Sequence, residues 1–429
     1  MDEKAALGYW NLRPDRARDA ADGPFDPEAM ERLDHGPLLR VGLDQGDLRG
    51  GSHLAIQAAV DYVAGLGGGT VLLGPGRFEL RNAVTLRNRV RLAGTPGKTE
   101  LVACAGLETQ LVLDGDCNER RVTLAEPDGF RVGDGISIQD KRMSGGFGVT
   151  TATLTARAPD DPRAFLISTP LYYDYMVAQE ASARLTFPLI GAWGARDAEV
   201  RDLSLDGNKA QAQPLNGCRG GGIYFFECER MAIRDCVVRA YQGDGISFQV
   251  SNDVRIERCR VEACAALGLH PGSGSQHPVL LDNRSIGNGG DGLFVCWRVK
   301  HGRFERNEIR ANGGHGISIG HKDTDNLFMG NTIAANGGCG VLFRNESEPM
   351  GAHRNVFERN AILDNGAKEA PAAVHVLGHA HDLVFRGNVI GREVDKPGPG
   401  VGILLGPNAK HFIEEGNEFR NVSVKVQRA

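Results

Sequence analysis

The second half of this chain repeats one short phrase about once every 24 residues, and this repeat limits the fold more than any other feature. A repeat of this length holds two or three short strands, whereas a propeller blade needs four strands in ~40 residues. No repeat carries a helical apolar stripe or the Leu-x-x-Leu-x-Leu pattern of leucine-rich repeats. Parallel coils stacked ~4.8 Å apart satisfy the pattern. The sequence therefore predicts an all-β chain, a single-stranded right-handed parallel β-helix.

Three columns of residues recur in this repeat from about residue 196 onward. Asparagine at a repeated turn can adopt the left-handed conformation, and stacked amides can bond from coil to coil. Cysteine at these positions is interpreted as a buried substitute, and the nine cysteines form no CxxC pair, which argues against a structural zinc site. The columns are Gly245, Gly268, Gly292, Gly316 and Gly340; Cys236, Cys259, Asn283, Asn307, Asn331, Asn360, Asn388 and Asn417; and Cys264, Asn288, Asn312, Asn336 and Asn365.

The first half of the chain predicts three further units. Residues 1–50 contain four prolines and are expected to form an extended N-terminal arm on the main body, residues 51–425. A helix from Ser52 to Leu66 is expected to cap the first coil, whose edge would otherwise be exposed. Residues of about 120–190 break the rhythm and predict a β-rich insertion. Its tyrosines, at 172, 173 and 175, either cover a groove or fill the insertion's own core, and we favour the core.

Composition excludes several classes of function. The net charge of −5, with acidic and basic residues interleaved, gives no reason to expect nucleic acid or an anionic membrane as a partner. No run of 18 apolar residues occurs, and no signal peptide is visible, which predicts a cytoplasmic location. A chain whose signal peptide had been removed would look the same and would be secreted or periplasmic. Homo-oligomer formation stays open.

The strand phrase separates inward from outward positions, because side chains alternate along a strand. The residue after each glycine should point inward, and the next one should point to solvent. Residues just before each glycine lie at the entrance turn of the strand, and adjacent coils bring such residues within ~5 Å. This places Asp291 beside His315, puts Asp244 two coils before Asp291, and sets His270 on the outward face between them.

These four residues, Asp244, His270, Asp291 and His315, are the candidate catalytic residues. Asp244 has about even odds of being an ordinary turn residue, since Gly-Asp-Gly is a common turn. A basic line beside them could hold carboxylates or sulfates, and an aromatic ring could stack on a sugar. The candidate substrate-binding residues are Tyr224, Glu227, Trp297, Arg298, His321, Lys322, Asp323 and Arg344.

The repeats resemble the pectin-lyase-like superfamily of right-handed β-helices over roughly residues 50–425. The opening from Ala55 to Gly94 and the phrase Leu203–Asn208 carry this resemblance, which implies action on polysaccharides by hydrolysis, β-elimination or C5 epimerisation. Gly314–Gly320 is similar to the Gly-His-Gly-x-Ser-x-Gly motif of polygalacturonase-like glycoside hydrolases. That family's paired aspartates are incomplete here, because Gly290 precedes Asp291 and Leu267 stands on the preceding coil.

We therefore expect an enzyme that cleaves glycosidic bonds of an acidic poly- or oligosaccharide, with a slight preference for hydrolysis. In the hydrolase version Asp291 and Asp244 share the acid and base roles, and His315 orients one of them. In the lyase or epimerase version His270 or Lys322 removes the C5 proton, and Arg298 or Arg344 neutralises the uronate. A non-catalytic glycan-binding or structural rod is the third alternative. No cofactor is expected, and no acidic cluster is dense enough to support the calcium ion common in such lyases.

Overall fold

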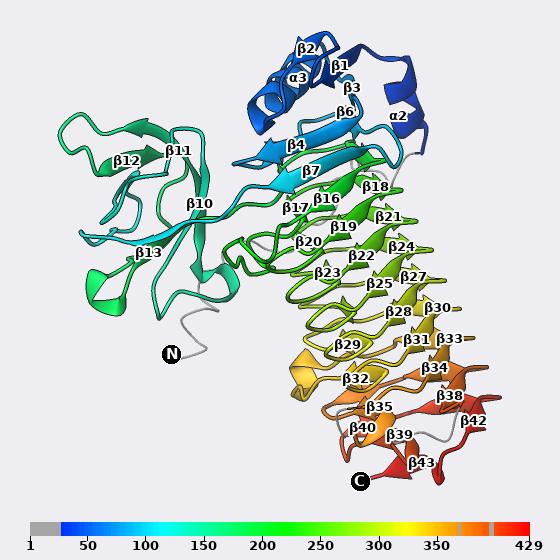
Figure 1. Ribbon diagram of the computed structural model, residues 1–429. Coiled ribbons are helices and arrows are strands. Elements are labelled where there is room, and N and C mark those ends of the chain that lie inside the picture. The colour runs from blue at the N-terminus through cyan, green and yellow to red at the C-terminus, as the bar shows by residue number, and fades with distance from the viewer. Residues whose placement is uncertain (1–26, 368–369, 394–398) are drawn as a thin grey trace.

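Three long parallel sheets form a rod, and a separate antiparallel sheet projects from one side of it (Figure 1). The computed structural model describes residues 27–367, 370–393 and 399–429. Sheet A runs from β2 (Leu48–Arg49) and β1 (Leu38–Gly42) through β3 (Gly69–Leu73) to β41 (Ile413–Glu415). Sheet B runs from β4 (Gly76–Leu80) and β7 (Thr99–Ala103) to β42 (Glu418–Arg420).

Sheet C carries the candidate site on its outer face. Each coil contributes one short strand to each of the three sheets in turn, as β18 (Ala232–Arg234), β19 (Val237–Arg239) and β20 (Ile246–Gln249) do. This confirms the predicted parallel β-helix and sets the number of strands in such a coil at three. The other strands of sheet C are β5 (Val84–Thr85), β14 (Ile190–Trp193), β17 (Ile223–Phe226), β23 (Leu269–Pro271), β26 (Leu293–Phe294), β29 (Ile317–Ile319), β32 (Val341–Phe343), β35 (Ala372–Val376), β39 (Val401–Leu405) and β43 (Val424–Arg428).

The core lies inside the coils, where similar side chains of successive coils stack on one another. The predicted inward residues after each glycine are all at most 1% exposed: Ile246, Leu269, Leu293, Ile317 and Val341. Phenylalanines stack face to face along sheet A, with ring centroids 4.7, 4.4 and 4.7 Å apart from Phe304 through Phe328 and Phe357 to Phe385. Each coil thus buries its apolar side chains against the next coil rather than against a distant layer.

Both predicted asparagine columns form buried ladders. Asn307 Nδ2 donates to Leu280 O and to Asn331 Oδ1, each at 3.0 Å, while its own Oδ1 accepts from Asn283 N at 3.0 Å. Cys259 continues the ladder upward, since its N–H donates to Asn283 Oδ1 at 2.9 Å. The side-chain amides therefore hydrogen-bond both to one another and to backbone groups of the neighbouring coil.

Replacing Asn307 with Ala is expected to lower the free energy of unfolding by about 1–3 kcal/mol, because it leaves buried backbone groups without partners. Urea unfolding followed by circular dichroism measures this loss. Asn417→Ala is the matched control, because Asn417 stands at the half-buried end of the same ladder, where water can replace the amide. Equal losses at both positions would show that burial of the ladder does not matter.

The N-terminal part differs from the predicted extended arm. Residues 1–26 lie outside the described residues, while α2 (Pro27–Arg32), the short helix η1 (Leu33–His35), β1 and β2 are regular elements, and β1 extends sheet A by pairing with β3. The capping helix is confirmed as α3 (His53–Gly65), although Ser52 makes no side-chain cap hydrogen bond. Leu54 on this helix is 63% exposed, whereas His53 is buried. None of the described helices is long and apolar enough to cross a membrane.

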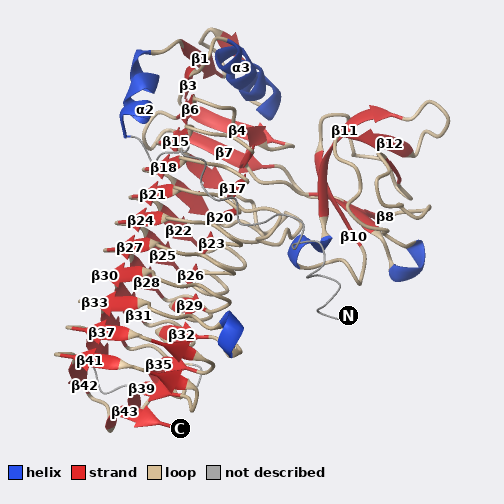
Figure 2. Ribbon diagram, turned by 180° about the vertical axis from the view of Figure 1, so that it is seen from behind, coloured by secondary structure: helices blue, strands red, loops and turns tan. Residues whose placement is uncertain are grey.

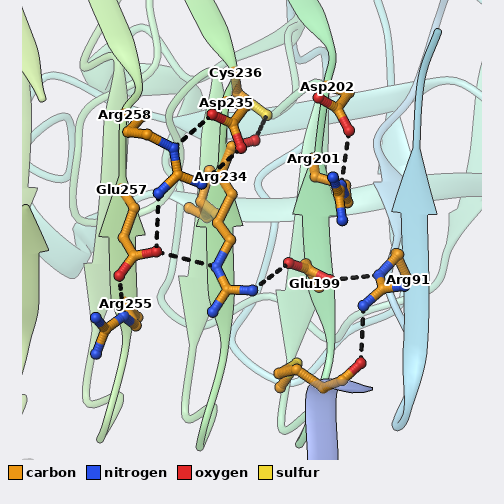
Figure 3. Close-up of polar contacts among 12 residues, drawn as sticks. Arg91, Glu199, Arg201, Asp202, Arg234, Asp235, Cys236, Arg255, Glu257 and Arg258 are labelled. Carbon is orange, nitrogen blue, oxygen red and sulfur yellow. Dashed lines mark hydrogen bonds and ion pairs between the residues drawn. The ribbon is translucent and has the colours of Figure 1, made fainter. Parts of the chain in front are cut away.

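An ion-pair ladder fixes α2 to the first coils of sheet A (Figure 3). Arg91 pairs with the fully buried Glu199, and its Nη2 also donates to Met30 O on α2 at 2.8 Å. Arg234 then bridges Glu199 (3.1 Å) and Glu257 (3.2 Å) on successive strands. Each buried carboxylate in the ladder therefore meets at least one guanidinium, as buried charges require.

The insertion is a six-stranded antiparallel sheet that leaves the rod between β7 of sheet B and β14 of sheet C (Figure 2). It begins at β8, earlier than the predicted boundary near residue 120. Tyr175 is fully buried, and its hydroxyl lies 2.7 Å from both Thr150 Oγ1 and Gly148 O, which confirms a core role for this tyrosine. Its strands are β8 (Glu108–Gln110), β9 (Arg121–Thr123), β10 (Gly135–Gln139), β11 (Thr150–Arg157), β12 (Ala164–Ile167) and β13 (Ser182–Leu185).

Candidate functional site

Two rows of turns border the outer face of sheet C. The turns that lead from sheet B into sheet C carry Asp244, Asp291 and His315, and the turns that lead out toward sheet A carry the predicted basic residues. Between the rows, Tyr224, Ser247 and His270 are in register on β17, β20 and β23, and Phe294, Ser318 and Leu342 continue the register on β26, β29 and β32. The fold therefore gathers residues from six coils onto one face.

A segment of residues 207–222 covers the upper part of this face. Ser247 Oγ donates to Gly217 O at 2.6 Å, and the Tyr224 hydroxyl donates to Cys218 O at 2.7 Å. Position 217 must be glycine, because a Cβ there would lie 1.6 Å from Asp244 Oδ2. As a result Tyr224 is 1% and His270 3% exposed, which corrects the expectation that this column faces solvent.

Asp244 and His270 form a buried pair beneath Gly217. His270 Nδ1 lies 2.7 Å from Asp244 Oδ2, and the other carboxylate oxygen accepts from Leu267 N at 3.1 Å. An ionised carboxylate only accepts hydrogen bonds, so the neutral imidazole carries its proton on Nδ1 and presents the Nε2 lone pair. Gln249 Nε2 lies 3.4 Å from that Nε2. A base oriented by a carboxylate is the arrangement that general-base catalysis uses.

Asp291 and His315 lie on adjacent coils, as predicted. The His315 N–H donates to Asp291 Oδ1 at 2.6 Å, while His315 Nδ1 accepts from Cys339 N at 2.9 Å. Both side chains are half-buried. Burial raises the pKa of Asp291, although the His315 amide and the charge of Arg344 oppose the shift. A half-exposed carboxyl with a raised pKa is suited to donate a proton.

Arg344 runs back across two coils and lies over the ring of Phe294, with its Cζ 4.5 Å from the ring centroid. Its guanidinium donates to Ser318 Oγ at 3.0 Å, Val295 O at 2.8 Å and Asp323 Oδ2 at 3.2 Å. His270 meets the edge of the same ring, 5.3 Å between centroids. Arg344 keeps unused N–H donors, since three of its five are engaged. The imidazole of His270 and the guanidinium of Arg344 thus flank the half-buried ring of Phe294.

Asp323 is fully buried, so it holds Arg344 rather than facing a ligand. It also accepts from Val299 N at 2.9 Å and Gly320 N at 3.0 Å. Burial raises its pKa to about 7, although the Arg344 charge and the two backbone donors oppose the shift.

The free energy of unfolding is expected to fall as pH rises from about 4 to 7, because Asp323 keeps its proton in the folded state while the unfolded state releases it near pH 4. The contribution at its steepest is about 1.4 kcal/mol per pH unit. Urea unfolding of the wild type and of Asp323→Asn across this range isolates the effect. Parallel pH profiles for the two proteins would contradict this assignment.

A basic and aromatic patch lies beside Arg344 on the turns that leave sheet C. Trp297 and Arg298 on one coil, and His321 and Lys322 on the next, are adjacent pairs in the left-handed conformation. Trp297 stacks on His321 with ring centroids 4.6 Å apart, and Arg298 and Lys322 form no salt bridge with any described residue.

Burial keeps His321 neutral. Burial, with the positive charges of Arg344 and Arg298, lowers the pKa of His321 to about 4, and Glu346 contacts the ring. The patch therefore carries a positive potential that suits an anionic ligand. Glu346 is not among the predicted binding residues, although it lies beyond the same strand as Arg344, two residues further along the chain.

Arg219 links the covering segment to the insertion. Its guanidinium lies over the rings of Tyr172 (4.4 Å) and Phe147 (5.0 Å), and its Nη2 donates to Phe147 O at 2.7 Å. Tyr172 therefore helps to hold the covering segment, while Tyr175 packs in the core of the insertion. No repeat position predicts Arg219 or Gly217; the only signal was the irregular run of glycines around them. Glu227, a predicted binding residue, is exposed at the end of β17.

A cleft of about 330 Å³ separates the insertion from the rod. None of the predicted catalytic or binding residues lines it. Its walls come from the insertion and from the turns that lead into sheet C: Gln139, Ser144, Arg184, Pro214, Leu215, Asn216, Gln242, Gly243, Ala265 and Ala266.

Comparison with known proteins identifies the fold. Residues 221–390 match the family described as "Right handed beta helix region". No curated protein matches the chain by sequence. The A-module of mannuronan C-5 epimerase AlgE6 from Azotobacter vinelandii aligns over 87% of this chain and 91% of its own, with 16% identity and a TM-score of 0.58.

Two other solved structures are similar to this chain over most of its length. The AlgE4 A-module from the same organism covers 90% of this chain and 97% of its own, with 16% identity and a TM-score of 0.58. The Dettilon tailspike protein gp208 covers 88% and 65%, with 13% identity and a TM-score of 0.53. Identities this low establish the shared fold. The chain therefore has the right-handed parallel β-helix fold.

Proposed function

We propose that this protein is a carbohydrate-active enzyme that removes the C5 proton of a uronate in an acidic poly- or oligosaccharide, as a lyase or a C5-epimerase. The glycan would lie over Phe294, between the entrance turns of Asp291 and His315 and the basic patch. The single observation that carries the proposal is the 2.7 Å contact between His270 Nδ1 and Asp244 Oδ2, which leaves Nε2 as an oriented base.

The chemistry needs a cation, a base and an acid, and the site offers one of each. Arg344 would neutralise the uronate carboxylate, which makes the C5 proton acidic. His270 Nε2 would accept that proton. In β-elimination the C5–H electron pair forms the C4–C5 double bond, the C4–O4 bond breaks, and O4 takes a proton from Asp291. In epimerisation Asp291 would instead return a proton to C5 from the opposite face.

The covering segment must move for this chemistry. His270 is 3% exposed beneath Gly217, so a substrate reaches Nε2 only after residues near 217 shift. Side-chain hydrogen bonds hold the middle of the segment: Gly217 O accepts from Ser247 and Gln249, Cys218 O accepts from Tyr224, and Arg219 donates to Phe147 O. Lids held this way commonly close over substrate and exclude water.

Three features support an acidic glycan as the ligand. Arg298 and Lys322 lack acidic partners among the described residues, and Arg344 has spare donors for a carboxylate. The stacked Trp297 and His321 rings offer a flat surface for a sugar. Two structures with the same fold bear the name mannuronan C-5 epimerase. Uronate polymers should therefore be tested as substrates before neutral sugars.

Hydrolysis, slightly preferred from the sequence, remains the second candidate because burial raises the pKa of Asp291, as a general acid requires. It also requires a second carboxylate beside the scissile bond. Asp244 is 2% exposed and bonded to His270, and Asp323 is fully buried beside Arg344. Each of these carboxylates already holds another side chain of the site, so proton abstraction, which uses the Asp244–His270 pair as it stands, is the better supported reaction.

A panel of acidic and neutral polysaccharides separates the candidates. New near-ultraviolet absorption from unsaturated ends would indicate a lyase, and inversion at C5 without chain cleavage would indicate an epimerase. Reducing ends without unsaturation would indicate a hydrolase and overturn the proposal. Binding without turnover across the panel would favour the non-catalytic rod, and the same would hold if replacing His270, Asp291 and His315 together left affinity unchanged.

A further inference from the structure

A cluster of histidines lies away from the candidate site, on the turns between sheets C and A near the C-terminal end. Glu348 opens the short helix η4 (Glu348–Met350), which projects beside β32 (Figure 2). His353 ends the same loop, and His379 and His381 lie on the next coil at β36 (Ala380–His381). One potential ligand atom from each of Glu348, His353 and His381 lies within 4.8 Å of the other two.

The geometry points to a binding site for a divalent transition-metal ion of the zinc class, held by Glu348, His353 and His381, with His379 bonded to the Glu348 carboxylate. The Nε2 atoms of His353 and His381 both face Glu348, 3.3 Å from its carbonyl oxygen and 3.9 Å from Oε1 respectively. His379 Nδ1 lies 2.8 Å from Glu348 Oε2. One carboxylate thus stands among three imidazoles.

The two rings that would carry the metal are already held side by side. His353 and His381 stack with centroids 3.7 Å apart and planes 15° apart. Tetrahedral zinc, with bonds of about 2.0 Å to nitrogen or oxygen, places its ligand atoms roughly 3.3 Å apart. The side chains are 28% exposed at His381, 29% at His379 and 52% at Glu348, so small rotations can close the remaining distance.

A supporting shell of hydrogen bonds favours the metal-binding form of His381. Its Nδ1 lies 2.6 Å from Asp382 Oδ2, so the proton stays on Nδ1 and Nε2 presents a lone pair. A carboxylate behind a ligating histidine is the usual arrangement around bound zinc. Binding at His353 Nε2 moves that ring's proton to Nδ1 and breaks the 3.2 Å bond from His381 N.

The donor set selects the kind of metal. Imidazole nitrogens suit zinc, nickel and copper, whereas calcium takes six to eight oxygen ligands. The cluster offers three imidazoles and one carboxylate, which is too few oxygens for calcium. Bound metal would tie the irregular loop that follows Arg344 to the next coil, independently of what the main site does.

Zinc titration of chelator-treated protein by calorimetry tests the site. We work in a Cys117→Ser background, because Cys117 is an exposed thiol that could itself take zinc. One zinc per chain is expected, with a Tm that rises with zinc concentration, and no response to calcium. Asp382→Asn is expected to weaken binding about 10–100-fold, and the double change His353→Ala and His381→Ala to abolish it.

A matched control uses a second stacked imidazole pair, His277 and His301, with centroids 5.1 Å apart. Changing both to Ala should leave zinc affinity unchanged. Glu348→Gln, at an exposed position, is the substitute if the double His variant does not fold. Zinc affinity that survives both the double variant and Glu348→Gln, or no zinc binding by the parent protein, would overturn the proposal.

Discussion

Replacing His270 with Gln is expected to lower turnover of the acidic glycan by about 10²–10⁴-fold, the usual contribution of a positioned general base. Glutamine keeps the size and polarity of the ring, so the pocket beneath Gly217 stays filled. The KM for the glycan should change little, because His270 is nearly buried and contributes little to ground-state binding. Steady-state kinetics of both proteins measure this split between kcat and KM.

Two further variants show whether the loss is due to the base. Asp244→Asn removes the acceptor that fixes the imidazole proton on Nδ1, and turnover should fall by a similar factor. His375→Gln is the control, because His375 lies further along the same outward column, in register with Leu342. A normal rate in His270→Gln, or an equal loss in His375→Gln, would remove His270 from the mechanism.

Removing the guanidinium of Arg344 is the second large effect. Arg344→Lys keeps a positive charge beside Asp323 but loses the planar fork, and kcat/KM on uronates should fall by about 10²–10³-fold. Truncating Arg344 alone would also leave Asp323 buried without its ion-pair partner, which destabilises the fold. The double change Arg344→Met and Asp323→Asn removes both partners, so it separates catalysis from stability.

Carboxyl-reduced glycan provides the substrate-side control for Arg344. If the guanidinium neutralises a uronate, the wild type should act on the reduced, neutral polymer no better than Arg344→Lys does. Circular dichroism and Tm of the double variant establish that it is folded. Full activity of this double variant on uronates would show that Arg344 only supports the fold.

Much of the rod follows from its sequence because each coil repeats the chemistry of the previous one. The residues after Gly245 and Gly292 point inward, and Asn283 and Asn307 stack, because neighbouring coils impose the same environment. The contact between Asp291 and His315 follows from the same register. A repeat of fixed length therefore predicts which residues of successive coils form a column, and the column predicts which side chains are in contact.

The remaining features come from segments that do not repeat. Gly217 covers His270 through a loop with no counterpart on other coils, so the burial of that column could not be predicted. Arg344 reaches back to Val295 O over 49 residues of sequence, across the coil between them. The histidine cluster lies where the loop before His353 lengthens the coil, which changes the spacing of like residues from 24 to 29.

The most direct test of proton abstraction is ¹H NMR of uronate polysaccharides incubated with the protein in ²H₂O. Both elimination and epimerisation remove the original C5 hydrogen, whereas hydrolysis leaves it in place and creates reducing ends. Proton abstraction by His270 predicts loss of the H5 signal from at least one uronate polymer, and retention of that signal with His270→Gln. Retention of H5 in every polymer while reducing ends appear, or equal loss with His270→Gln, would contradict it.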